Sequence, residues 1–154
     1  MKVILNFIVF MVMSNACNDK VTTNIPENLI QENTNLQVSY KATTRGFYEK
    51  VWITKDSIYM TNDRNSQHVI SQAINVDFWN ELLALVHKTD LQQLEKLEPP
   101  TKMYQVDGAA MATIEVATNH EVFKTKTFDH GHPPKAISVL VNKVLSVKEI
   151  LAKQ

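Results

Sequence analysis

The segment LQVSYKATTRGFYEKVWITKDSIYMT, residues 36–61, decides the fold of this chain. Apolar and polar residues alternate at residues 36–40, and aromatic and β-branched residues fill 47–54, which is typical of strands. A third such run occupies residues 57–61, and short polar turns, of which Thr43–Gly46 is the first, separate the runs. Because the connections are so short, we expect consecutive strands to pair antiparallel.

After this segment the spacing of the apolar residues changes from that of strands to that of a helix. A turn signal at residues 62–65 and a candidate fourth strand at 67–73 come first. Residues 76–88 then place apolar side chains at the i, i+3, i+4, i+7 spacing of a helix face, namely at Trp79, Leu82, Leu83 and Val86. We therefore expect a helix there, with Trp79 in the core, and we expect Trp52 in the core of the second strand.

The second half repeats this order. Residues 110–117 and 121–128 read as a hairpin, and residues 134–152 read as a closing helix with an apolar face. The predicted order is β-β-β(-β)-α-β-β-α. Half-polar strands and stripe-faced helices favour an α+β fold, with an antiparallel sheet and two helices packed on one face.

The composition excludes several classes of function. The chain has 16 Lys plus Arg and 16 Asp plus Glu, whereas nucleic-acid-binding domains usually carry a basic excess. Its three glycines, Gly46, Gly108 and Gly131, are too scattered to form a phosphate-binding loop. We therefore predict neither a nucleic-acid partner nor a nucleotide cofactor, and no other cofactor is indicated.

The N-terminus reads as an export signal. Residues 1–16 combine one lysine, an apolar run and small residues before Cys17. The run of about eleven residues is shorter than the roughly 20 that span a bilayer as a helix. Cys17 is the single cysteine, and at a new N-terminus it can accept a lipid anchor. Lipidation is favoured over the alternative, a plain secreted chain cut at the same bond, because secreted domains usually pair their cysteines and a single one at the predicted new N-terminus suggests a special role. Ser14 stands where the common lipoprotein pattern prefers Leu, a departure that leaves the export prediction intact.

The lipid on Cys17 would hold the protein on a membrane of the bacterial envelope, on the periplasmic or cell-surface side. Residues 18–34 are polar and rich in Asn and Thr, which suits a flexible tether. A flexible tether of this length spans roughly 23 Å. Residues 35–154 then form a single domain.

The densest polar cluster is Asp129-His130-Gly131-His132. Two histidines and a carboxylate could ligate a metal such as Zn²⁺, with a further ligand from Asp107 or from His68, His87 or His120. No recognised zinc spacing is present. The structural alternative is that Asp129 caps the closing helix, because an acidic residue near a helix N-terminus is stabilised by the exposed N–H groups.

The loops at one end of the predicted sheet form the candidate ligand site. If these loops gather, Arg45 can pair with Asp107 or Asp129 and present an anion-binding point. The hypothesised ligand-binding residues are Arg45, Asp107, Asp129, His130 and His132. The expected ligand is an envelope protein or a small molecule.

Two other functions stay open. The first is a metal-dependent or His/Asp-assisted hydrolase that uses the Asp129–His132 loop, although no Ser or Thr lies in a nucleophile elbow. The second is a structural envelope component without a ligand site. An enzyme is the less favoured reading.

Several blocks of this chain carry a family resemblance. They are Arg45-Gly46-Phe47-Tyr48, Asp63-Arg64-Asn65, the helix with Trp79, Asp107-Gly108-Ala109-Ala110 and Phe128-Asp129-His130-Gly131-His132-Pro133-Pro134. Together they resemble small uncharacterised lipoproteins of flavobacteria and related Bacteroidetes. The resemblance covers most of residues 40–145 and implies export, a lipid anchor and one small domain. It implies no activity.

Overall fold

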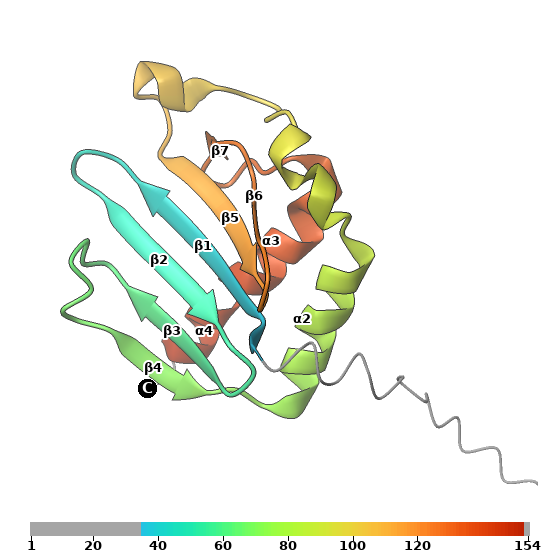
Figure 1. Cartoon of the computed structure of the whole chain (residues 1–154). Coiled ribbons are helices and arrows are strands. Elements are labelled where there is room, and N and C mark those ends of the chain that lie inside the picture. The colour runs from blue at the N-terminus through green and yellow to red at the C-terminus, as the bar shows by residue number, and fades with distance from the viewer. Residues whose placement is uncertain (1–34, 153–154) are drawn as a thin grey trace, which may run out of the picture.

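The computed structural model describes residues 35–152 (Figure 1). The export signal, Cys17 and the tether at 18–34 lie outside the described residues. Their predictions therefore stand as made.

The described part contains an antiparallel sheet of seven strands. The strands are β1 (Gln37–Thr43), β2 (Tyr48–Ile53), β3 (Ser57–Thr61), β4 (Ile70–Ala73), β5 (Met111–Ala117), β6 (Val122–Lys124) and β7 (Phe128–Asp129). Their order across the sheet is β4-β3-β2-β1-β5-β6, and β7 pairs with the beginning of β5. The meander β1 to β4 follows the chain, whereas the β1–β5 pairing joins the two halves of the domain.

The helical segments follow the two groups of strands. They are α2 (Val76–Lys88), η2 (Leu91–Lys96), η3 (Met103–Val106), η4 (Lys135–Ile137), α3 (Ser138–Leu145) and α4 (Val147–Leu151). In Figure 1, α3 and α4 cross behind the sheet. None of the helices within residues 35–152 combines the length and the apolar character needed to cross a bilayer.

The core lies between the helices and one face of the sheet. Val38, Tyr40 and Ala42 alternate along β1 and are fully buried there. Val51 and Ile53 of β2 continue the same face. The predicted α+β class, with helices on one face of an antiparallel sheet, is confirmed.

Helix α2 follows its sequence signals closely. The Asn75 side chain accepts a 2.7 Å hydrogen bond from the Phe78 N–H and so caps the first turn. The predicted stripe residues Trp79, Leu82 and Val86 are buried. The helical spacing and the N-terminal cap were both predicted correctly, because each depends on residues that are close together in the chain.

Three details differ from the sequence analysis. The closing helix is divided into η4, α3 and α4, and the predicted strand at 121–128 contains only β6 and, after a gap, part of β7. The two-residue strand β7 was missed because so short a pairing has no periodicity to detect. Trp52 is a half-exposed residue on the face of the sheet that the core does not use, so its predicted place in the core is wrong. Alternation in β2 puts Val51 and Ile53 inside and Trp52 opposite them.

Candidate functional site

Three separate segments meet where β1 ends. Thr43 pairs with Tyr48 of β2 on one side and with Met111 of β5 on the other. Met111 in turn pairs with Asp129 of β7. We call this end of the sheet, formed by residues 44–47, 101–111 and 128–132, the loop end. The predicted gathering of these loops is therefore present.

Asp129 has a structural role at the loop end. Its carboxylate is 1% exposed and accepts hydrogen bonds from the Thr101 hydroxyl at 2.5 Å, the Met103 N–H at 2.9 Å and the Tyr104 N–H at 2.7 Å. Burial by itself would raise the pKa of Asp129. The three hydrogen bonds outweigh burial and hold the pKa below its usual value. The ionised Asp129 carboxylate therefore holds residues 101–104 in place through these three hydrogen bonds.

The structural alternative predicted that Asp129 caps the closing helix, and this is wrong. The carboxylate caps the first turn of η3, more than twenty residues earlier in the chain, instead of the closing helix. Neither η4 nor α3 has a side-chain cap at its start. The same preference of carboxylates for free helical N–H groups operates, but the tertiary structure supplies a different helix.

His130 turns into the domain beside Tyr40. The Tyr40 hydroxyl lies 2.7 Å from His130 Nδ1, and the Phe47 ring lies 5.9 Å from the imidazole, centre to centre. Burial lowers the pKa of His130 below 6.5, while the Glu49 charge opposes and the Lys148 charge reinforces the shift. Burial also raises the pKa of the Tyr40 hydroxyl, helped by Glu49 and opposed by the Gly131 N–H. Both shifts favour the neutral forms of the imidazole and the phenol, which share one hydrogen bond.

A buried carboxylate lies beneath this pair. Glu49 is 4% exposed, and its Oε2 lies 2.7 Å from the Lys148 ammonium of α4. Its other oxygen, Oε1, accepts no hydrogen bond from residues 35–152. The ion pair ties the beginning of β2 to α4 and places a buried carboxylate near the loop end.

The neutral state of His130 predicts a pH dependence of stability. Its folded-state pKa is lowered, so its contribution is fully present above 6.5 and is lost as the pH falls through the folded-state pKa. Between pH 7 and pH 5, unfolding free energy from urea melts should fall more steeply in the wild type than in His130→Asn, whose amide oxygen can still accept from Tyr40. Parallel curves would show that the imidazole titrates alike in folded and unfolded chains.

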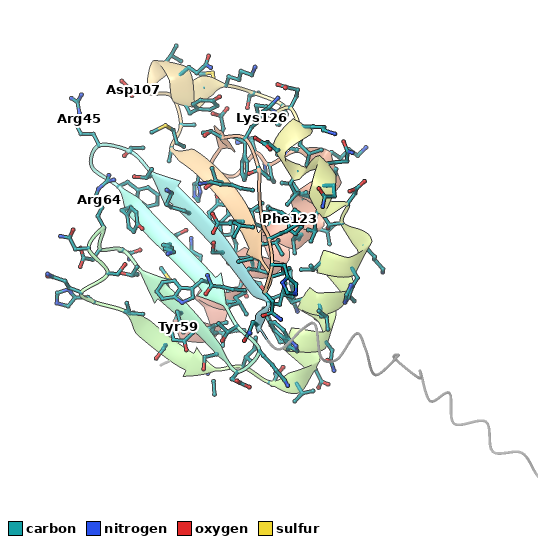
Figure 2. All side chains as sticks on the ribbon, viewed as in Figure 1. Arg45, Tyr59, Arg64, Asp107, Phe123 and Lys126 are labelled. Atoms are coloured by element: carbon teal, nitrogen blue, oxygen red, sulfur yellow. The ribbon has the colours of Figure 1, made fainter. Side chains whose placement is uncertain are left out.

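The remaining predicted residues lie apart from one another. Arg45 and Asp107 are exposed at the tips of two different loops on the same edge (Figure 2). Within residues 35–152 no ion pair joins Arg45 to Asp107 or Asp129. Asp107 adopts a left-handed conformation with φ of 57° and ends η3, while the exposed His132 donates its N–H to the Asp129 carbonyl at 2.8 Å. The structure thus brings the loops together, but Arg45 forms no ion pair with Asp107 or Asp129 among the described residues.

The candidate metal ligands are also separated. His68 lies in the β3–β4 loop, 3.8 Å from Asp63, and His87 and His120 line a groove with Leu36 at the other end of the sheet. Among the described residues, no cluster of three or more His, Cys, Asp or Glu side chains could hold a metal ion.

Sequence reasoning missed a set of exposed apolar side chains at the loop end. They are Phe47 (40% exposed), Met103 (50%), Val106 (71%) and Met111 (45%). We call these four residues the loop-end surface. The available signal was limited to Met103 and Val106, two large apolar residues in a segment to which no helix or strand period was assigned, because Phe47 and Met111 lie in runs that read as strands.

The β1–β2 loop, which carries Phe47, is braced from the neighbouring loop. The Arg64 guanidinium donates to the Thr44 and Phe47 carbonyls and lies 5.4 Å from the centre of the Tyr48 ring. These hydrogen bonds hold the backbone of Thr44 and Phe47 and link the β1–β2 loop to the β3–β4 loop.

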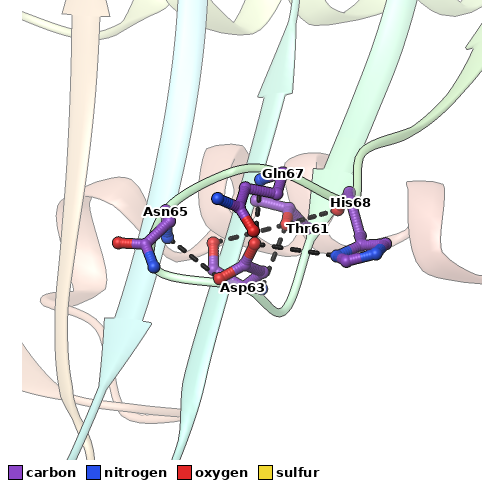
Figure 3. A network of polar contacts seen from close by, with 5 residues as sticks. All are labelled: Thr61, Asp63, Asn65, Gln67 and His68. Atoms are coloured by element: carbon purple, nitrogen blue, oxygen red, sulfur yellow. Dashed lines mark hydrogen bonds and ion pairs between the residues drawn. The ribbon is translucent and has the colours of Figure 1, made fainter.

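Asp63 holds the loop that positions Arg64 (Figure 3). Its two carboxylate oxygens accept from the Asn65 N–H at 3.0 Å and the Gln67 N–H at 2.8 Å, and these hydrogen bonds lower the pKa of Asp63. Thr61 closes the same loop by donating to the His68 carbonyl at 2.6 Å. The predicted turn at 62–65 is confirmed as this network.

Comparison with known proteins adds no family assignment. No family model matches the chain, and no curated protein matches it. The resemblance to flavobacterial lipoproteins accordingly stays a prediction.

Proposed function

We propose that this protein is an exported domain, anchored to an envelope membrane by a lipid on Cys17, that binds a partner protein through the loop-end surface. The supporting observation is that four exposed apolar side chains from three segments lie at one end of the sheet. Apolar side chains that gather on a surface in this way are typical of protein contacts, whereas small-molecule sites are mostly concave.

The position of this surface suits an anchored protein. The chain enters the described domain at residue 35, before β1, and the loop end follows the other end of that strand. A strand of seven residues is about 20 Å long, from a rise of about 3.4 Å per residue. A tether that leaves the domain before β1 would therefore leave the loop-end surface free to face away from the membrane.

The chemistry of the surface also suits a protein partner. Met103 and Met111 are flexible, polarisable side chains that adapt to different partner shapes. Exposed Arg45 and Lys102 stand beside them and supply a polar rim. Arg45, Asp107 and His132 remain available to a ligand at this rim, whereas the buried carboxylate of Asp129 is already engaged.

The hydrolase alternative has less support in this geometry. His130 Nδ1 faces the Tyr40 hydroxyl, and the Asp129 carboxylate faces Thr101 and the η3 backbone. Asp129 therefore does not orient the His130 imidazole, as a carboxylate does in a general-base pair.

Site-specific photo-crosslinking in intact cells tests the proposal. A photoreactive residue at Phe47 or Val106 should give a covalent adduct of one discrete mass, because these side chains would lie inside the contact. The matched control is Val139 of α3, which is 63% exposed but lies away from the loop end. Equal adducts at Val139, or none at Phe47 and Val106, would contradict a loop-end interface.

A second arm of this experiment tests the anchor. The Cys17→Ser chain cannot accept the lipid, so it should leave the membrane fraction and lack the added lipid mass. If the wild type carries no added lipid mass, or if Cys17→Ser stays in the membrane fraction to the same extent as the wild type, the lipid-anchor part of the proposal is wrong. The loop-end adduct is scored separately, so the two parts can fail independently.

A further inference from the structure

The face of the sheet opposite the helices carries an aromatic pair. Trp52 of β2 and Tyr59 of β3 are register partners, and their rings stack with centres 5.2 Å apart and planes 8° from parallel. Both side chains are half-exposed. We call this side, which is turned away from the core, the open face.

Two lysines lie directly opposite each other on the open face. Lys41 of β1 and Lys50 of β2 are register partners, so both ammonium groups project from neighbouring positions on one side of the sheet. Within residues 35–152 neither forms an ion pair. Glu115, on the same face of β5, is engaged by Lys124 at 3.9 Å.

This arrangement opposes folding stability. Like charges directly opposite each other in an antiparallel pair are destabilising, and a carboxylate at either position would be favourable. The Lys50 ammonium lies 5.1 Å from the centre of the Trp52 ring, which offsets part of the repulsion. The exposed Lys41 makes no such contact with a ring in the described part of the chain. The stacked aromatic pair stabilises the sheet, which is enough to explain its presence. The lysine pair destabilises the sheet, so its presence calls for another explanation.

We propose that the open face binds an acidic polysaccharide, one whose sugar rings carry carboxylates. A pyranose ring can pack its C–H face on the side of the half-exposed Tyr59 ring that is not stacked on Trp52, while a carboxylate accepts hydrogen bonds from Lys41 and Lys50. The Thr113 hydroxyl, beside Lys41 in the register, can bond sugar hydroxyls. A sheet face that no helix covers suits an extended chain that repeats both features.

The charge distribution separates this ligand from a nucleic acid. A phosphate backbone carries a negative charge on every nucleotide and calls for a broad basic surface. The unpaired cations on the strands of the open face are restricted to Lys41 and Lys50 among the described residues, and Glu115 lies two positions from Thr113. The proposal shares no residue with the loop-end surface and can succeed or fail independently of it.

Calorimetric titration with hexagalacturonate tests the proposal, with maltohexaose as the uncharged probe. The wild type should bind hexagalacturonate but not maltohexaose, and affinity should weaken as salt screens the lysines. Lys41→Gln/Lys50→Gln should bind about tenfold more weakly, from the loss of two charge-assisted contacts. Its melting temperature should stay the same or rise, because the repulsion is removed.

The matched charge control is Lys88→Gln/Lys135→Gln, which changes the net charge equally at two exposed lysines off the open face. It should bind within about twofold of the wild type. Tyr59→Leu should weaken binding, whereas Tyr104→Leu, which removes a tyrosine from η3, should not. Undetectable binding by the wild type, equal binding of maltohexaose, or equal losses in the two lysine variants would each overturn the proposal.

Discussion

Asp129→Asn should lower the melting temperature by roughly 10 °C, one of the largest effects of a single polar substitution in this domain. The carboxylate accepts from Thr101 and from the Met103 and Tyr104 N–H groups. An amide replaces one acceptor oxygen by an N–H₂ group, so a donor would face donors in a site that is 1% exposed. The segment that carries Met103 and Val106 would lose its attachment to β7.

Asp107→Asn is the matched control for this prediction. Asp107 lies in the same part of the domain but is exposed, and asparagine tolerates its left-handed backbone. Thermal melts followed by circular dichroism should place this variant within about 1 °C of the wild type. Equal melting temperatures for Asp129→Asn and Asp107→Asn would show that the three hydrogen bonds contribute nothing to stability.

The lowered pKa of Asp129 also predicts that the domain loses stability at low pH. The pKa of Asp129 is lowered in the folded state from its ordinary 3.8. Its contribution is therefore fully present above that value and is lost as the pH falls through the folded-state pKa. Urea melts from pH 6 to pH 2 should show the wild type converging on Asp129→Asn at the acid end.

Phe128→Ala should reduce the free energy of unfolding by about 3–5 kcal/mol, as expected for a buried phenylalanine cut to alanine. The ring is fully buried, with its centre 6.3 Å from that of Tyr40. It anchors β7, whose pairing with Ala112 places Asp129 and His130 at the loop end. The loss combines the transfer of the ring from the core with the cavity that remains.

Phe47→Ala provides the control for the loss of an aromatic ring. Phe47 is 40% exposed, so we expect its removal to cost about 1 kcal/mol or less. Guanidinium melts of both variants measure the difference directly. A cost for Phe128→Ala no greater than that for Phe47→Ala would mean that β7 is not held by the core. Phe128→Leu, which keeps most of the apolar volume, should recover part of the loss.

The elements with local signals were predicted correctly. The meander from β1 to β4 and helix α2 follow from alternation, helical spacing and turn residues, each of which is readable within about ten neighbouring residues. The turn at 62–65 was also correct, because Asp63 bonds to the backbone only two and four residues ahead. In the same way, alternation alone should have placed Trp52 opposite Val51, so that error was one of interpretation.

The candidate site was predicted only in outline. The sequence analysis treated the gathering of the loops at one end as a condition for the site, and it did not predict the roles of their residues. The Tyr40–His130 contact joins residues 90 positions apart, and the contacts of Asp129 join residues 25–28 positions apart. Both depend on the pairing of β1 with β5 and of β5 with β7, and no local pattern specifies either pairing.

The sequence by itself therefore determined the strands of the β1 to β4 meander, the first helix, the α+β class and the expectation of an export signal that ends before Cys17. Only the tertiary structure decided that Asp129 is a buried anchor for η3, that His130 faces Tyr40, and that Lys41 and Lys50 share an open face with Trp52 and Tyr59. The physical reason is the range of the interactions. Backbone periodicity and turn chemistry act between near neighbours, whereas burial and the choice of hydrogen-bond partner depend on which distant segments the sheet brings together.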